Sequence, residues 1–254
     1  MSWLSRDRKS VLILTLSTVL FLSVLPFDNP PAQAQSVGER IVNLFRRERK
    51  QGRASGRARG TAMRDEFCVS VTSQPLTALV SADNLGTTVS AYPTLWFYLP
   101  LDHSETITKA RFVLFDENQR LVLDQTMALP DAPGIVSVKL PETEPPLEVG
   151  KRYNWFFQVL CDEQERSRNP WVSGWVERVE ASSELVRQLE TLPESEQYRA
   201  YLDHGISQEA LTQLAWHRSV HAEPWMSLLG YFKLEGVADA AVTQLNPLAE
   251  TSSD

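Results

Sequence analysis

The sequence predicts a mainly β protein, in which a β-sandwich over residues 64–180 precedes a small α-helical C-terminal extension over residues 181–232. Two observations lead to this prediction. Between residues 64 and 180, short runs of strand-forming residues recur about every ten residues, and Pro, Gly, Asp and Asn separate them, as in all-β sandwiches. After residue 180 the apolar spacing becomes helical, because Leu185, Leu189 and Leu192 fall on one helix face.

The stretch from residue 147 to residue 180 gives the sandwich its type. Gly150 can turn the chain sharply into an aromatic strand that starts near Tyr153. The spacing Leu147-x-x-Gly150-x-x-Tyr153 resembles the tyrosine corner of immunoglobulin and fibronectin type III domains, although an ordinary glycine turn would look similar. Residues 171–180 form a second strand, whose alternation indicates a half-exposed edge. We therefore expect an immunoglobulin/fibronectin-III-like β-sandwich.

Residues 1–34 have the layout of a secretory signal peptide. Basic residues at positions 6, 8 and 9 precede an uncharged apolar run over residues 11–25, and Ala32-Gln33-Ala34 has the small-x-small form that signal peptidase accepts. We predict cleavage between Ala34 and Gln35. The run is shorter than the ~20 residues that a spanning helix needs. We expect export to the periplasm or the extracellular space; the alternative is an inner-membrane anchor at residues 11–25.

The segment 35–63 is basic and contains several glycines. Residues 35–60 hold eight basic and two acidic residues, whereas residues 61–254 hold 14 basic and 28 acidic residues. Such a composition buries little apolar surface, so we predict a disordered arm that is dispensable for folding. Only residues 37–45 could form a helical turn or two, with Ile41, Leu44 and Phe45 on one side. The arm is either a solvated linker or a contact to anionic surfaces. Export and the lack of interleaved aromatic residues argue against nucleic acid.

The C-terminal part is predicted to be helical as far as residue 232. Ser182 or Ser183 can cap the first helix, and two further helices over residues 193–205 and 207–217 resemble one tetratricopeptide-type hairpin. A single hairpin of this type cannot bury its own apolar face, so we expect it to pack on the sandwich or on a partner. Residues 225–229 suggest a last short helix, and residues 233–254 a loose tail.

The sequence contains none of the catalytic or nucleotide-binding motifs that we sought. His217 and His221 would share a helix face, but they lack further ligands at suitable spacing, so we expect no zinc site. The acidic cluster Asp162, Glu163 and Glu165 lacks the regular spacing of a calcium loop. We therefore predict no metal, no cofactor and no enzymatic activity.

Two pairs of residues are candidates for specific roles. Cys68 and Cys161 are the only cysteines, and an exported protein would hold them in a compartment where disulfides persist. We predict a disulfide between them; the alternative is two buried thiols. Trp171 and Trp175 are candidate ligand-facing aromatic residues, since sugar rings stack on exposed indoles, and packing within the sandwich is the alternative reading.

Several blocks of sequence resemble a known family. The blocks LTALV, YPTLWFYLP, PGIVSVKLP, LEVGKRYNWFFQVLCD, WVSGWVERVE and HGISQEALTQLA follow one another in the order of the cyanobacterial domain-of-unknown-function family 928. The resemblance extends from about residue 67 to residue 229. It implies an exported cyanobacterial protein, and it brings no activity or catalytic residue with it.

Two functions remain open from the sequence. The first is a non-enzymatic envelope protein that binds another envelope protein or a glycan. The second is a hydrolase of glycosidase type with carboxylates in its loops, since such enzymes need only a suitably placed pair. A cleft with two carboxylates about 5–10 Å apart would favour the hydrolase.

Overall fold

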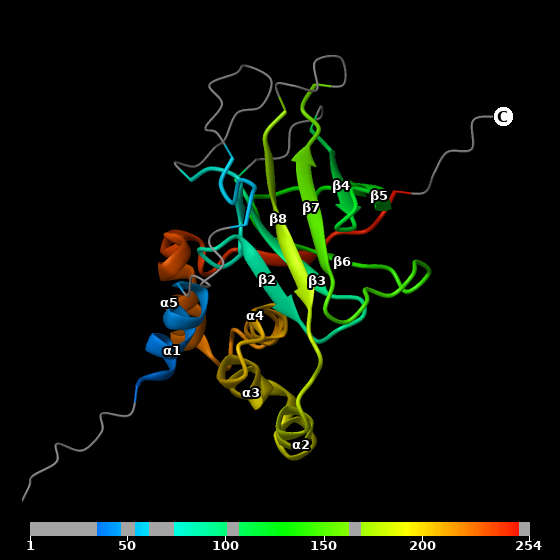
Figure 1. Ribbon diagram of the computed structural model, residues 1–254. Helices are drawn as coiled ribbons and strands as arrows, with labels where there is room; N and C mark the ends of the chain where they lie inside the picture. The colour runs from blue at the N-terminus through cyan, green and yellow to red at the C-terminus, as the bar shows by residue number, and fades with distance from the viewer. Residues whose placement is uncertain (1–34, 47–53, 61–73, 101–106, 163–168, 249–254) are drawn as a thin grey trace, which may run out of the picture. The chain divides into compact units, whose positions relative to one another are not determined.

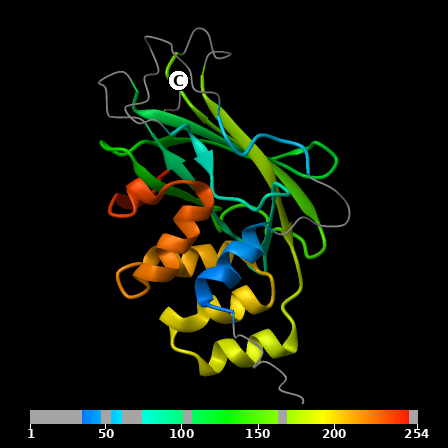
Figure 2. The ribbon, with the colours of Figure 1, turned by 90° about the vertical axis from the view of Figure 1, so that its left-hand side faces the viewer.

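The fold is described from a computed structural model, in which residues 35–46, 54–60, 74–100, 107–162 and 169–248 are described. They belong to one compact unit, residues 35–254. The predicted signal peptide, with Ala34, lies outside the described residues, as do Cys68, Glu163 and Glu165. Figure 1 shows two sheets with helices beside them, and Figure 2 shows the helices together on one side of the sheets.

Two mixed sheets contain the strands of the described residues. The four-stranded sheet has the order β1-β3-β6-β9, and the five-stranded sheet has the order β2-β8-β7-β4-β5. Neighbours are antiparallel except for β2 with β8 and β6 with β9, which are parallel. The predicted mainly β architecture is confirmed. The bounds are β1 Thr77–Ala78, β2 Leu85–Thr88, β3 Thr94–Leu99, β4 Lys109–Phe115, β5 Leu121–Ala128, β6 Gly134–Lys139, β7 Arg152–Val159, β8 Trp171–Arg178 and β9 Ala241–Gln244.

The two sheets share one apolar core. Phe97 of β3 stacks on Phe157 of β7 with ring centroids 4.3 Å apart, and it meets Trp155 edge-to-face at 5.5 Å. These side chains are at most 2% exposed. Burying one large apolar side chain contributes about 1.5–3 kcal/mol, so this contact between the sheets is a main source of stability.

Strand β7 has the geometry that its sequence predicts. Gly150 has φ +79°, and the N–H of Glu148 donates to the Tyr153 hydroxyl at 3.0 Å, so the tyrosine is tied to the turn before it. Tyr153, Trp155, Phe157 and Val159 are all buried, whereas Phe156 and Gln158 on the opposite face are half-buried. The alternation thus separates a core face from an outer face.

Strand β8 lies inside its sheet, so the prediction of an edge strand was wrong. Its Trp175–Arg178 half pairs in parallel with β2 on one side, and its whole length pairs with β7 on the other. The four-residue β2, LGTT, was too short for its pairing partner to be read from sequence. Gly174 is required here, because a Cβ at this position would lie 2.4 Å from the ring of Trp155.

The helical extension packs on the four-stranded sheet, as one of the two predicted alternatives stated. Leu79, Trp96, Tyr98 and Ile135 project from that sheet into a second core with the helices. Ser182 caps the first helix by accepting from the N–H of Leu185. The helices are α2 Ser183–Thr191, α3 Gln197–Asp203, α4 Ser207–Trp216 and α5 Ala222–Phe232, with 3₁₀ turns η2 Glu194–Glu196 and η3 Glu235–Val237.

Helix α4 is also tied to β2 by polar side chains. The N–H of Thr87 donates to the Ser207 hydroxyl at 3.0 Å, and the Thr87 hydroxyl donates to the carbonyl of Gly205 at 2.7 Å. Two residues further along α4, Oε1 of Glu209 accepts from the Thr88 hydroxyl and from the N–H of Ser90, at 2.5 and 3.1 Å. A carboxyl group is therefore held at the joint between the five-stranded sheet and the helices.

The predicted disordered arm is ordered over residues 35–46, where helix α1 spans Val37–Arg46. Ser36 and Glu39 exchange hydrogen bonds in a capping box. Ile41 and Phe45 are fully buried in the second core, and the Tyr231 hydroxyl of α5 donates to the carbonyl of Phe45 at 2.8 Å. The sequence indicated the apolar side of residues 37–45, but the basic residues that follow led us to assign the segment as a whole to a disordered arm.

Residues 54–60, called the edge segment below, are a second correction to the predicted arm. Arg57 exchanges two backbone hydrogen bonds with Ser173 of β8, and Ala58 and Gly60 bond to the backbone of residues 78 and 76. Arg59 donates to the carbonyl of Phe232 at 2.6 Å, at the end of α5. The edge segment therefore joins both sheets and the helices, because the open backbone groups at two sheet edges pair with it.

The tail is not loose between residues 241 and 248. Strand β9 pairs in parallel with β6, and Leu245 is buried in the core between the sheets. The N–H of Leu248 donates to the carbonyl of Thr126 at 2.8 Å. The short run AVTQ carries little hydrophobic signal by itself, and its order comes from the vacant edge of β6.

Candidate binding face

The five-stranded sheet turns one face to the shared core, and its other face carries a shallow depression. Six side chains from three adjacent strands line a volume of about 350 Å³, called the outer depression below. They project outward because they occupy the alternate positions to the buried core residues. The lining residues are Arg111, Val113 and Phe115 of β4, Phe156 and Gln158 of β7, and Trp171 of β8.

A row of aromatic rings crosses this face. Phe156 lies between the other two: its ring centroid is 6.0 Å from that of Phe115, at an interplanar angle of 86°, and 6.1 Å from that of Trp171. Cross-strand pairing places Val113 beside Phe156, and Gln158 beside Trp171. All three aromatic side chains are half-buried. The strand register therefore builds a continuous apolar floor that remains open to solvent.

The arginine of β4 is already neutralised. Arg111 binds Asp124 of β5 through two parallel hydrogen bonds, of which Nε to Oδ1 measures 2.8 Å. The hydrogen bonds to Asp124 raise the pKa of the Arg111 guanidinium above its usual range. Because both N–H donors of this guanidinium edge bind Asp124, the Arg111–Asp124 pair at the rim of the depression carries little net charge.

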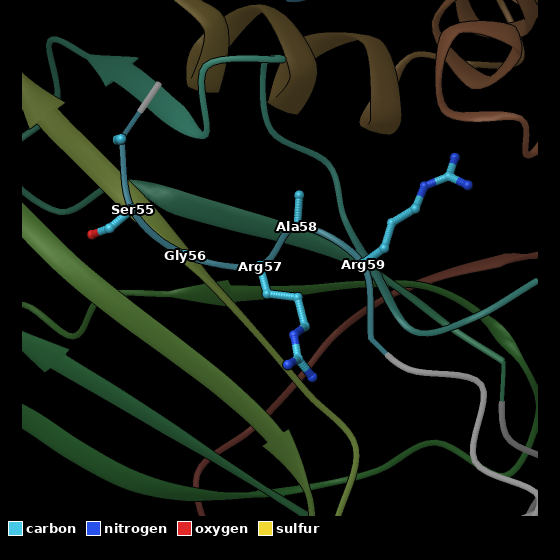
Figure 3. A pocket seen from close by; sticks show the side chains of 6 residues that line it. Ser55, Gly56, Arg57, Ala58 and Arg59 are labelled. Atoms are coloured by element: carbon cyan, nitrogen blue, oxygen red, sulfur yellow. The ribbon is translucent and has the colours of Figure 1, made fainter. Parts of the chain in front are cut away.

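A second cation reaches the face from the edge segment. The Cζ atom of Arg57 lies 4.4 Å from the ring centroid of Trp171. Figure 3 shows the side chain of Arg57 extending to the opposite side of the segment from Ala58 and Arg59. Backbone bonds of 3.0 and 2.8 Å to Ser173 fix its position along β8. No carboxylate among the described residues forms an ion pair with Arg57.

The two tryptophans predicted to face a ligand occupy different surroundings. Trp171 lines the outer depression. Trp175 is half-buried, and its indole N–H donates to the carbonyl of Ser55 at 2.9 Å, so it holds the edge segment in place. The outer depression thus contains one of the two candidates.

The two histidines considered as zinc ligands from the sequence, His217 and His221, have protein neighbours in the helical part. The side chain of His221 is 8% exposed, its ring lies 4.8 Å from that of Tyr198, and its Nε2 is 3.6 Å from Glu196. Nδ1 of His217 lies 3.0 Å from the carbonyl of Gln213. Among the described residues, no group of three or more His, Cys, Asp or Glu side chains could hold a metal ion.

Cys161 and Asp162 lie at the end of β7. Both backbone N–H groups donate to Oδ1 of the buried Asn169, at 3.0 and 2.8 Å, so the asparagine fixes the two ends of the loop between β7 and β8. Cys161 is partly buried against the shared core. Its predicted partner Cys68 lies outside the described residues, and the disulfide stays a prediction.

Sequence reasoning did not select most residues of this face. The alternation along β7 puts Phe156 and Gln158 on the face opposite Trp155 and Phe157, and this period of two was the available signal. Phe115 and Arg111 lie in one of the runs of strand-forming residues between residues 64 and 180, but the register of β4 against β7 follows from tertiary pairing. Arg57 was assigned to a disordered arm, and no local pattern connects it to Trp171.

The comparisons with known proteins identify the family. A family model described as Domain of Unknown Function (DUF928) matches residues 55–242. The chain belongs to the DUF928 family. The match begins in the edge segment and ends in β9, so the DUF928 region includes both sheets, the outer depression and helices α2–α5. No curated protein and no solved structure matches this DUF928 chain.

Membrane-spanning helices are absent from the described part of the DUF928 chain. None of its helices combines the length and the apolar character that crossing a bilayer requires. The apolar run at residues 11–25 lies outside the described residues.

Proposed function

We propose that this DUF928 protein is an exported, non-enzymatic binding module of a cyanobacterial cell envelope, and that its ligand binds at the outer depression. The observation that supports this function is the aromatic row Phe115, Phe156 and Trp171, which is half-buried on a sheet face that the helices leave open. Concave sites with an apolar floor and a few polar groups are the usual places for ligands. Aromatic side chains and arginine are also enriched at protein interfaces.

The lining of the outer depression favours binding over catalysis. Its six residues include no carboxylate, histidine, cysteine or hydroxyl group that could act as nucleophile or general base. The nearest acid named above, Asp124, is engaged by Arg111. The alternative of a glycosidase-like hydrolase needs two carboxylates across a cleft. No observation on this face favours it.

We also propose that the two sheets form an immunoglobulin/fibronectin-III-like β-sandwich. Strands β1-β3-β6 and β5-β4-β7-β8 follow the order of sheets A-B-E and C′-C-F-G of an immunoglobulin/fibronectin-III-like sandwich. In this correspondence β7 is strand F, and Tyr153 stands at its start, where the tyrosine corner of that fold lies. The extra strand β2 is added in parallel beside strand G, and β9 beside strand E.

Export to the periplasm or the extracellular space is part of the proposal. Its support is the signal-type segment, with cleavage between Ala34 and Gln35. Helix α1 starts directly afterwards, with Ser36 in its capping box, so the folded unit would lose nothing by this cleavage. N-terminal sequencing of the exported protein should begin at Gln35; an intact Met1 in the membrane fraction would instead support the anchor at residues 11–25.

A pull-down tests the proposed function. The bait is the protein from residue 35 to residue 254, incubated with envelope extract. Phe156→Ser removes the central ring of the face, and Val186→Ser on α2 removes an apolar side chain that is 43% exposed but distant in the fold. We expect both variants to fold, and only Phe156→Ser to lose the bound component. Equal recovery by all three baits would refute the assignment of the site.

A further inference from the structure

The outer depression and Arg57 together carry a more specific inference. We infer that the ligand is a protein segment that inserts an aromatic or aliphatic side chain into the outer depression and places a carboxylate against the guanidinium of Arg57. This inference rests on the proposed function and specifies the chemistry of its ligand. It follows from the covering of Trp171, from the volume of the depression and from the charges beside it.

Arg57 covers a face of the indole of Trp171, because its Cζ lies 4.4 Å from the ring centroid. A sugar ring cannot stack on the face that Arg57 covers. The indole therefore supplies a wall of the depression more readily than a platform for a glycan. This geometry favours a side chain that fills the space between Phe115, Phe156 and Trp171.

The volume agrees with a small apolar group. The outer depression measures about 350 Å³, at the lower end of the 300–1,000 Å³ that is typical of ligand pockets. Val113, Phe115, Phe156 and Trp171 form most of its lining, whereas Arg111 and Gln158 supply polar groups. One inserted ring would find aromatic edges and faces at ordinary contact distances. A single anchor side chain of this kind is typical of a protein interface.

The charges of Arg57 and Arg111 indicate which charged group the ligand should carry beside its apolar anchor side chain. Arg111 has its fork occupied by Asp124, but Arg57 forms no ion pair with a carboxylate of the described chain. A guanidinium that stacks on an indole keeps its N–H donors in its own plane, where they remain available to a carboxylate. Charge complementarity at this edge therefore requires an acidic group on the ligand.

Two small probes of the same shape test this inference. 3-Phenylpropionate carries an aromatic ring and a carboxylate, and 3-phenylpropanamide is its neutral counterpart. Both are titrated into ¹⁵N-labelled protein while the indole N–H signal of Trp171 is followed, assigned with Trp171→Phe. We expect millimolar half-saturation, with the acid binding at least about threefold more tightly than the amide and losing this advantage as salt is added.

Three variants and one control separate the contributions. Arg57→Gln retains the backbone bonds of the edge segment and should reduce the acid to the affinity of the amide. Arg57→Lys keeps the charge and should retain part of the preference. Phe156→Ser should abolish binding of both probes, while Val186→Ser should change neither.

The outcomes distinguish this inference from the proposed function. If acid and amide bind equally and Phe156→Ser removes both, the outer depression is a binding site but the acidic ligand is refuted. If neither probe binds and methyl β-cellobioside shifts the same signal, a glycan replaces the protein segment. If no probe binds, or if Phe156→Ser has no effect on binding, the inference and the assignment of the site fail together.

Discussion

Arg57 lies with its Cζ atom 4.4 Å from the ring centroid of Trp171, although the two residues are separated by more than a hundred positions in the chain. Backbone bonds between Arg57 and Ser173 hold the two side chains in register. The edge segment thus completes the binding face as well as the sheet edge. Removal of the edge segment should therefore affect both stability and binding.

Helix α1 should be required for stability. Phe45 is fully buried against the rings of Tyr231 and Phe232, with centroids 6.1 and 5.5 Å away. Phe45→Ala should lower the free energy of unfolding by about 3–5 kcal/mol. The exposed Asn43→Ala on the same helix should change it by less than about 0.5 kcal/mol. Urea unfolding measures both values. Equal stability of the two variants would mean that α1 is not docked in solution.

A chain that starts at Thr61 extends this test to the edge segment. It lacks α1 and the edge segment, and it should melt at least about 10 °C below the chain that starts at Gln35, because several kcal/mol of buried contacts are lost. Calorimetry of both chains measures the difference. Coincident melting curves would restore the disordered arm that the sequence predicted.

The sequence succeeded where a local pattern determines the structure. The alternation in β7, the glycine turn at Gly150 and the serine cap of α2 were all predictable, since each depends on neighbours in the chain. The edge segment, β2 and β9 were not predictable, because they are ordered by open sheet edges far away in sequence. Helix α1 was predicted only as a possible turn or two with Ile41, Leu44 and Phe45 on one side, because the arginines that follow led us to assign the whole segment to a disordered arm.

The candidate site follows the same division. Trp171 was selected because an exposed indole can stack on a sugar ring, and the alternation along β7 puts Phe156 on the face opposite Trp155 and Phe157. The meeting of Arg57 with Trp171 depends on a backbone pairing between residue 57 and residue 173, which no single-sequence pattern specifies. The basic composition of residues 35–63 instead predicted that Arg57 lies in a disordered, solvated arm.

Glu209 should make stability depend on pH. Burial raises the pKa of its carboxyl, and Oε2 has no hydrogen-bond partner among the described residues. A raised folded-state pKa means that the protonated carboxyl contributes stability below the unfolded value of about 4.3, and that this contribution is lost as pH rises through the folded value. Wild-type protein should therefore lose stability relative to Glu209→Gln as pH rises above about 4.3.

The measurement is urea unfolding of both proteins at several values between pH 4 and pH 8, since other groups cancel in the difference. Glu190→Gln, at an exposed position on α2, is the matched control and should run parallel to wild type. A constant difference between wild type and Glu209→Gln would show that the carboxyl does not titrate at a raised pKa.

Cys68 and Cys161 should be linked in the exported protein. The loop that the bond would close extends over roughly ninety residues, for which the chain-entropy model gives about 4–5 kcal/mol. Mass spectrometry of the non-reduced protein should find the two peptides joined, and the double variant with serine at both positions should be less stable. Two thiols that react freely with iodoacetamide in the native protein would contradict the bond.

Site-specific photo-crosslinking in cells that export the protein tests the binding face most directly. p-Benzoylphenylalanine is placed, in separate experiments, at Phe115, at Phe156 and at Val186 as the distant control. We predict a discrete higher-mass adduct with another protein from positions 115 and 156, with none from position 186, and loss of the adduct from position 115 when Arg57→Gln is added. Absence of any adduct from positions 115 and 156, or equal adducts from position 186, would contradict a binding function for this face.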